Sequence, residues 1–420
     1  MQVSLSLMLP RIRGIRRRNG SSFPTALPLE LQLLVLDEIS DNNPELQRLC
    51  RVCRAWGAYA QTLIFREVWV TEATVLRLVL LFETRPQLGN CTTTLRIVEE
   101  RDLGPSAQES TAPVLSRLAR RVPDLMPNLR TLHFIHRKSI APPLPPFCAH
   151  ALSGITNLRL SIGGSTTPAT LPGFIAHFSR LEGLEFPGSV CIANTSIAGW
   201  PLPPRSLKRL DLGAHFSVAP PGHPFSGPIT EWLSTGVAGV TDLSVASWYR
   251  EWDPTPTLLT NVNGSLRRLR LQERSVPPYA PLGIALPLSV PPFPILQHFE
   301  MNLDLSTRSA KYMELGLLAV LHQLSSPHLS TIYLETYVRQ GLLDLPWDDV
   351  DMALQAFGSL REVVFDLWGM FDISGGEGPQ PWFYPSYREL CRHMRRKMRL
   401  SDSRGILTFR CAGGSPRTIA

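Results

Sequence analysis

Short hydrophobic segments of one recurring form are the strongest pattern along this chain. Each segment reads apolar-x-x-apolar-x-apolar, and its alternating part is typical of a half-buried β-strand. The first positions of these segments are Leu129, Ile155, Leu181, Leu207, Val240, Leu266, Leu296, Leu329 and Leu360. The intervals between them are 26, 26, 26, 33, 26, 30, 33 and 31 residues. With 44% apolar residues a single segment arises by chance at about one start in twelve, so the prediction depends on the spacing.

This spacing is typical of leucine-rich repeats, whose period is roughly 20–29 residues. Segments with helical or turn character separate the predicted strands, at 171–180, 229–236, 313–324 and 350–359. A strand, a connection and another parallel strand, repeated many times, predict an α/β fold built as a right-handed solenoid. We expect its strands on the concave side and its helices and loops on the convex side. No repeat has Asn or Cys at its ninth position, and proline-rich loops interrupt the chain, so the predicted solenoid is irregular.

Before residue 67 the hydrophobic pattern has a helical period instead. Three short helices are predicted, the first starting near Pro28 and the third near Gly57. Their apolar positions are Leu31, Leu34, Val35, Ile39, Leu46, Leu49, Val52, Cys53, Trp56 and Ala60. A short strand at 67–70 and a helix at 71–84 follow. Because three short helices enclose only a small core, such a module usually depends on a neighbour or a partner.

Composition and charge narrow the class of protein. The chain has 38 prolines and 29 glycines in 420 residues, which disfavours long helical bundles and coiled coils. The net charge is +7, yet residues 1–29 carry +5, residues 384–420 carry +7 and the part between them carries −5. The basic character therefore belongs to the two ends, and a nucleic-acid-binding body is disfavoured.

The cysteines and the hydrophobic runs indicate the compartment. Seven scattered cysteines, an odd number, are typical of reduced thiols, so we expect a cytoplasmic or nuclear protein. No run of apolar residues is long enough to span a membrane. Residues 1–24 are expected to be a disordered basic tail, with a mitochondrial transit peptide as the alternative interpretation.

The sequence contains no catalytic or metal-binding constellation that predicts an enzyme. The phosphate-binding loops, the zinc-protease motif and the serine-hydrolase motif are all missing from the sequence. Cys50-x-x-Cys53 has the spacing of half a zinc or redox site, but no second pair follows at metal-binding distance. Because Cys53 lies in an apolar helical stripe, we predict that it belongs to the core. We therefore expect no enzyme activity, no cofactor and no metal.

The segment from Ala26 to Val70 combines several short motifs at fixed distances. It contains Leu27-Pro28-x-Glu30-Leu31, then Val52-Cys53-Arg54-x-Trp56, then Leu63-x-Phe65-Arg66-x-Val68. With this order and spacing the segment resembles an F-box, in the form found in the large F-box families of fungi. The resemblance implies an F-box at 25–70, and the repeats are predicted to follow at 71–415. Leu390, Cys391, Met394 and Met398 have helical spacing and predict a capping helix at about 384–400.

The resemblance to F-box proteins also implies a function. An F-box is a three-helix module that docks on a Skp-family adaptor, and through it on a cullin, in a ubiquitin ligase. The chain would then be a substrate receptor that binds a target protein for ubiquitination, and it would bind no small-molecule substrate. The adaptor-facing positions carried over from the family are Leu27, Pro28, Leu31, Val35, Leu36, Ile39, Val52 and Trp56. The alternatives are a non-degradative repeat scaffold and a basic protein that binds nucleic acid or a membrane surface.

The target-binding surface is predicted from the alternation of the strands. Residues between the buried leucines face the concave side, where a partner can reach them. Arginines gather in the middle repeats of this column and acids towards its C-terminal end. The predicted target-binding residues are Arg268, Arg270, Glu300 and Tyr333. Because arginine pairs bidentately with carboxylates, an acidic target segment near Arg268 and Arg270 is expected.

Overall fold

The computed structural model describes much of the 420-residue chain. The described residues are 34, 36–39, 43–99, 121–136, 152–162, 171–187, 197, 199–213, 227–246, 255–272, 290–303, 317–337, 345–368 and 387–412. The chain divides into two compact units. The first contains Met1–Ile135 and Pro145–Gly154, and the second contains His136–Leu144 and Ile155–Ala420.

The first unit begins with helices and continues into parallel strands. Its elements are α2 (Asn43–Leu49), α3 (Arg54–Arg66), β1 (Glu67–Thr71), α4 (Glu72–Thr84), α5 (Pro86–Asn90), β2 (Thr94–Glu99) and β3 (Thr131–His136). Strand β1 pairs in parallel with β2, in a register that places Glu67 opposite Thr94. The predicted strand at 67–70 and helix at 71–84 are thus confirmed to within one residue at each boundary.

A small hydrophobic core holds α2 and α3 together with the residues before them. Leu36, Leu46 and Ala60 are fully buried at its centre. The partly buried residues packed against them are Ile39, Leu49, Cys50, Trp56, Tyr59, Leu63 and Ile64. Since only three side chains are completely enclosed among the described residues of this module, little apolar surface is removed from water.

The start of α3 differs in one detail from the sequence-based prediction. Cys53 is exposed and is not a core residue; it precedes α3, and its Sγ accepts a hydrogen bond from the backbone N–H of Trp56 at 3.5 Å. Gly57 is the fourth residue of α3 and so lies near the start of this helix, as predicted. A Cβ atom at Gly57 would lie 2.9 Å from the carbonyl oxygen of Cys50, so glycine permits the close approach of the preceding turn. The helix starts directly after Cys53, because an N-cap residue has an extended backbone and lies just outside the helix.

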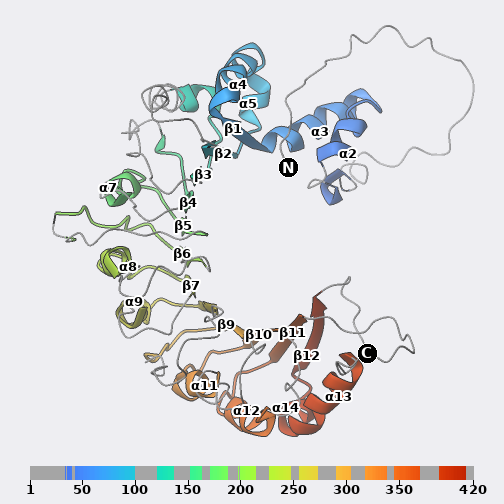
Figure 1. Ribbon diagram of the computed structural model, residues 1–420, viewed down its shortest axis with the longest axis vertical. Helices are drawn as coiled ribbons and strands as arrows, with labels where there is room; N and C mark the ends of the chain where they lie inside the picture. Colours follow the sequence, from blue (N-terminus) through green and yellow to red (C-terminus); the bar gives the residue numbers. More distant parts are fainter. Residues whose placement is uncertain are drawn as a thin grey trace, which may run out of the picture. The chain divides into compact units, whose positions relative to one another are not determined.

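The second unit is a series of parallel strands that alternate with helices. Its strands are β4 (Asn157–Ile162), β5 (Gly183–Glu185), β6 (Arg209–Leu212), β7 (Asp242–Ala246), β8 (Arg268–Gln272), β9 (His298–Leu303), β10 (Thr331–Tyr337), β11 (Glu362–Trp368) and β12 (Leu407–Ala412). Its helices are α7 (Leu171–Ala176), α8 (Gly227–Ser234), α9 (Thr255–Val262), α11 (Ala319–Gln323), α12 (Trp347–Leu354), α13 (Tyr387–Lys397) and α14 (Arg399–Ser403). Within each unit the strands are neighbours in sequence order. In the second unit the strands line the inner side, and helices α7 to α12 lie on the outer side (Figure 1).

The strand positions confirm the repeat predicted from the apolar spacing. Each of the strands β3 to β11 begins two residues after the first apolar position of its segment, as β4 does after Ile155. All nine first positions are buried, with at most 3% of any residue exposed. The second apolar positions form one row across the sheet of the second unit. This row runs Leu158, Leu184, Leu210, Leu243, Leu269, Phe299, Ile332, Val363 and Leu407.

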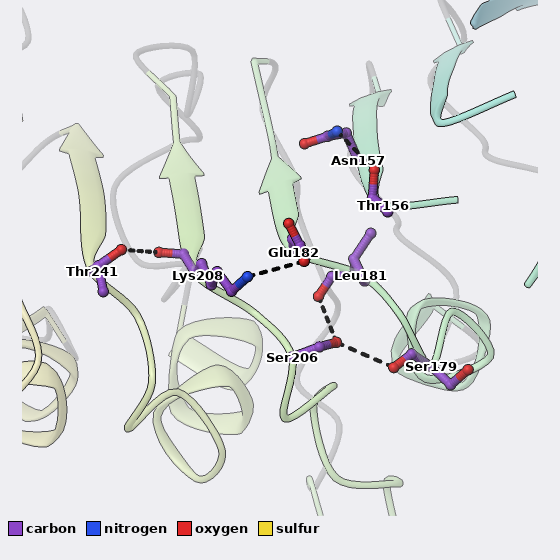
Figure 2. A network of polar contacts seen from close by, with 8 residues as sticks. All are labelled: Thr156, Asn157, Ser179, Leu181, Glu182, Ser206, Lys208 and Thr241. Atoms are coloured by element: carbon purple, nitrogen blue, oxygen red, sulfur yellow. Dashed lines mark hydrogen bonds and ion pairs between the residues drawn. The ribbon is translucent and has the colours of Figure 1, made fainter. Parts of the chain in front are cut away.

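Hydrogen bonds at the start of the strands join each repeat of the second unit to the next. The carbonyl of Thr156 accepts two backbone N–H groups, from Glu182 at 2.7 Å and Gly183 at 2.9 Å. The same doubled bond recurs at each later strand entry up to Ser330. Side chains reinforce it: the hydroxyl of Ser206 donates to the carbonyls of Leu181, at 2.8 Å, and Ser179 (Figure 2). Hydroxyl groups at strand entry thus join repeats that have no Asn or Cys at the ninth position.

The C-terminal part closes the core of the second unit. Leu390, Met394 and Met398 are fully buried, as the predicted capping helix at about 384–400 required. The chain then continues through α14 into β12, which pairs with β11 and was not predicted. The ring of Phe365 on β11 stacks on Phe409 of β12 at 5.4 Å, so this added strand extends the apolar core.

A buried carboxylate fixes α14 on α12. Asp351 is 3% exposed, and its carboxylate accepts the backbone N–H groups of Leu400 at 2.8 Å and Ser401 at 2.9 Å. The Ser401 hydroxyl donates to the same carboxylate at 2.5 Å. These donors lie in the first turn of α14, where backbone N–H groups have no partner within the helix. One side chain of α12 therefore satisfies the start of a helix about 50 residues later in the chain.

Candidate interaction surfaces

The predicted adaptor-facing residues fall into two groups. Leu27, Pro28, Leu31 and Val35 lie outside the described residues. Of the others, Leu36 is fully buried in the module core, and Ile39 and Trp56 are partly buried against it. Val52 is 60% exposed. The sequence pattern therefore did not distinguish the core residues of the module from its surface residues.

The exposed apolar residues of the module were only partly recognised from the sequence. Leu34 is 58% exposed, although its stripe in the sequence predicted a core position. Tyr59 lies on α3, and its hydroxyl donates to the carboxylate of Asp37 at 2.8 Å, which connects α3 to the residues before α2. This hydrogen bond is the main cause that raises the pKa of Tyr59 above its ordinary value. The described surface of the module thus presents two large aliphatic side chains, Leu34 and Val52, to solvent.

The inner face of the sheet in the second unit carries alternating charges. The residues between the buried rows are aligned across the strands, so Arg159, Glu185 and Asp211 are neighbours in one row. The same row continues through Ser244, Arg270, Glu300 and Tyr333. On strands β4 to β12 the described residues include five arginines and seven carboxylates. The face is therefore mixed in charge, with a small excess of acid; we call it the sheet face.

At the N-terminal end of the sheet face a glycine allows contact across a strand. The guanidinium of Arg209 on β6 donates to the side-chain oxygen of Asn157 on β4 at 3.0 Å, above Gly183 on β5. A Cβ atom at Gly183 would lie 2.5 Å from that oxygen, so any other residue would push the two side chains apart. Glu185 forms ion pairs with Arg159, at 3.7 Å, and with Arg209, at 3.5 Å. These charges compensate one another within the unit.

Arg270 is the centre of the sheet face. Its Nε lies 2.9 Å from Glu300 and its Nη2 lies 3.5 Å from Glu335, so it pairs with carboxylates of β9 and β10 at once. Burial raises the pKa of both carboxyls, and the charge of Arg270 opposes that rise. Arg268 is different: 55% of its side chain is exposed, and its nearest carboxylate, Asp242, lies 3.9 Å away.

Tyr333 belongs to a separate group at the C-terminal end of the sheet face. Its hydroxyl donates to the carboxylate of Asp366 on β11. The guanidinium of Arg410 on β12 lies 6.0 Å from the centre of the Tyr333 ring. Burial, together with this hydrogen bond, raises the pKa of Tyr333. The four predicted target-binding residues are therefore not one cluster: Arg270 meets Glu300, whereas Arg268 and Tyr333 have other partners.

Sequence reasoning missed several residues that complete these groups. Glu335 was not proposed, because it lies one step beyond the three apolar positions used to place the face. Arg410 was missed because β12 was not predicted. In the first unit, Trp69 on β1 is 42% exposed, and the guanidinium of Arg96 on β2 lies 4.7 Å from its ring centre. Trp69 could have been found from the sequence, because it alternates with the apolar positions of the strand predicted at 67–70.

The described part of the chain adds three further observations. It contains no helix with the length and apolarity needed to cross a membrane. Its described side chains include no cluster of three or more His, Cys, Asp or Glu residues arranged to hold a metal ion. Comparison with family models gives no match to this chain, and comparison with curated proteins gives none either.

Proposed function

We propose that this chain is the substrate receptor of a Skp–cullin–F-box type ubiquitin ligase. In this role the module at 25–70 docks on the Skp-family adaptor, and the repeats bind a target protein. The chain itself catalyses no reaction, because it only holds the target where a ubiquitin-charged enzyme can reach it. The proposal rests on the resemblance of Ala26–Val70 to an F-box and on the properties of that module.

One observation carries the adaptor half of the proposal. Among the described residues of α2, α3 and the segment before them, the core consists of Leu36, Leu46 and Ala60, while Leu34 and Val52 remain more than half exposed. Aliphatic side chains on a small module expose surface that water solvates poorly, and covering it with a partner is favourable. We infer that Leu34 and Val52 lie at the edge of the adaptor interface. Leu36 supports that interface from the core and does not touch the partner.

The target half of the proposal rests on the sheet face. Arg270 already compensates Glu300 and Glu335, whereas Arg268 on the same strand is more than half exposed and lies 3.9 Å from Asp242. An acidic residue of the target can reach and pair with Arg268 at little cost in desolvation, because more than half of this side chain is exposed in the unbound chain. The target is therefore recognised through the pattern of charged side chains on neighbouring strands of the sheet face.

The adaptor half is tested by binding to a purified Skp-family adaptor. The variant Leu34→Asp with Val52→Asp should bind at least tenfold more weakly, because two charges enter an apolar interface. The matched control is Leu202→Asp with Met352→Asp, two exposed apolar residues of the second unit. The control should bind as the unchanged chain does, and equal loss in both variants would contradict the assignment of this surface.

The second test of adaptor binding concerns Pro28 and Leu31, at the start of the predicted F-box. Pro28→Ala with Leu31→Ala should also weaken adaptor binding, by a few kcal/mol if these residues are central anchors.

A reconstituted ligase that contains the unchanged chain should assemble ubiquitin chains on proteins that co-purify with the chain. Adaptor binding without chain assembly would favour the alternative function, a non-degradative scaffold.

A further inference from the structure

A line of arginines lies on the outer face of the C-terminal helix in the second unit. Arg388, Arg392 and Arg396 follow one another at four-residue intervals on α13, so they share one side of the helix. All three are exposed. Consecutive members are separated by about 6 Å along the helix axis. We call these three residues the arginine stripe.

The arginine stripe has a fixed position because the opposite face of α13 is buried. Leu390 and Met394 are fully enclosed, and so is Met398, which follows the helix. The side chain of Arg396 also donates from Nε to the backbone carbonyl of Arg392 at 3.3 Å, which holds it along the helix. The stripe is therefore presented by a packed element, and a partner would lose little free energy in ordering it.

The charges of the stripe are not compensated within the described structure. Its neighbours do have partners: Lys397 pairs with Asp348 at 3.0 Å, and Arg395 lies 3.8 Å from Asp402. Among the described residues no carboxylate lies within ion-pair distance of Arg388, Arg392 or Arg396. Three adjacent like charges repel one another, and an anionic partner would relieve that repulsion.

The residues around the arginine stripe indicate which class of anionic partner it binds. The apolar face of α13 is already buried in the fold, so the helix cannot insert it into a membrane surface. The aromatic side chains of α13, Tyr387 and His393, are partly buried, so neither presents a fully exposed ring on which a nucleotide base could stack. The exposed acids Asp348 and Asp402 pair with Lys397 and Arg395, so these neighbouring charges are compensated within the fold and those of the stripe are not.

We propose that the arginine stripe binds an acidic helical segment of a partner protein. Carboxylates at four-residue intervals on such a segment have the same rise of about 6 Å, so three guanidinium groups can meet three carboxylates in register. Arginine pairs bidentately with carboxylates, which fixes the orientation of the two helices. The proposal is independent of the adaptor and of the sheet face.

The experiment uses the full chain and a fluorescent alanine-rich peptide with three glutamates at four-residue intervals. The control peptide has glutamines at the same positions. The test variant is Arg388→Gln with Arg392→Gln and Arg396→Gln. The control variant removes the same charge from exposed arginines elsewhere in the second unit, by Arg205→Gln, Arg267→Gln and Arg361→Gln. Thermal unfolding of both variants checks that each remains folded.

The glutamate peptide should bind the unchanged chain at least tenfold more tightly than the glutamine peptide. The test variant should lose this preference, and the control variant should keep it. Equal binding by the unchanged chain and the test variant overturns the proposal, as does an equal loss in both variants, which would reflect net charge alone. Tighter binding of a single-stranded oligonucleotide or of phosphatidylserine vesicles, removed by the test variant, would replace the acidic protein with that ligand.

Discussion

Arg270 shows how one side chain organises its neighbourhood. It compensates Glu300 and Glu335, two carboxylates whose pKa burial raises. A carboxyl whose pKa is higher in the folded state binds more protons when folded than when unfolded. The stability contributed by such a carboxyl therefore falls as the pH rises from the unfolded value through the folded one. Arg270 limits this loss because it favours the charged form.

The variant Arg270→Met should show this effect in its pH dependence. Without the guanidinium the pKa of Glu300 and Glu335 rises further, so their ionisation above the ordinary value of 4.5 costs more stability. We expect little change in the free energy of unfolding at about pH 4 and a loss of about 1–2 kcal/mol at about pH 7. Urea unfolding at both pH values measures it.

Arg268→Met provides the control for that prediction. Its carboxylate partner is 3.9 Å away and its side chain is more than half exposed, so its loss should change stability by less than about 0.5 kcal/mol. An equal loss at both pH values in the Arg270 variant would mean that the residue acts through packing alone.

Short elements in the second unit depend on contacts with elements distant in sequence. Helix α14 has only five residues, too few for its own hydrogen bonds to stabilise it. It persists because Asp351 of α12 accepts the N–H groups of Leu400 and Ser401. Through α14 the same carboxylate fixes the approach to β12.

Replacing Asp351 should therefore destabilise the C-terminal elements as a group. Asp351→Ala leaves two N–H groups and the Ser401 hydroxyl without their acceptor, at a cost of about 2–3 kcal/mol in the free energy of unfolding. Asp351→Asn keeps one acceptor and should cost less. Amide hydrogen exchange should show the loss of protection first in α14 and β12. Asp349→Ala, an exposed change in the first turn of the same helix, should cost about 0.5 kcal/mol; equal effects of the two alanine variants would contradict the cap.

At the scale of the whole molecule, the two proposed functions occupy different compact units. Leu34 and Val52 belong to the first unit, and Arg268 belongs to the second. Changes at separate, non-contacting sites are usually additive in free energy. We therefore expect adaptor binding and target binding to be separable by mutation.

The variant Arg268→Glu should change the set of co-purifying proteins and leave adaptor binding within twofold. The charge reversal adds a third carboxylate next to Asp242 and Glu300 and removes an accessible guanidinium from the sheet face. Quantitative mass spectrometry of the purified complexes measures the change, with Arg205→Glu, an exposed change outside the strands, as the control. An unchanged set would mean that the target is recognised elsewhere, with the proline-rich loops at 141–147 and 276–294 as the next candidates.

The amino-acid sequence by itself determined the repeating strands and their buried side. Leu158, Leu184 and Leu210 could be placed because burial of every second residue is a local property of an extended chain. The same reasoning placed Leu390 and Met394 on the buried face of a helix, since helical spacing is equally local.

Only the tertiary structure decided which polar groups meet. Glu335 reaches Arg270, and Asp351 reaches Ser401, across separations that depend on strand register and helix packing. Cys53 and Leu34 lie in apolar stripes of the sequence yet are exposed, because the small core around Leu36, Leu46 and Ala60 cannot enclose every apolar position. Hydrophobic period specifies which side of an element is buried, whereas the partner of a polar side chain depends on elements that are tens of residues away.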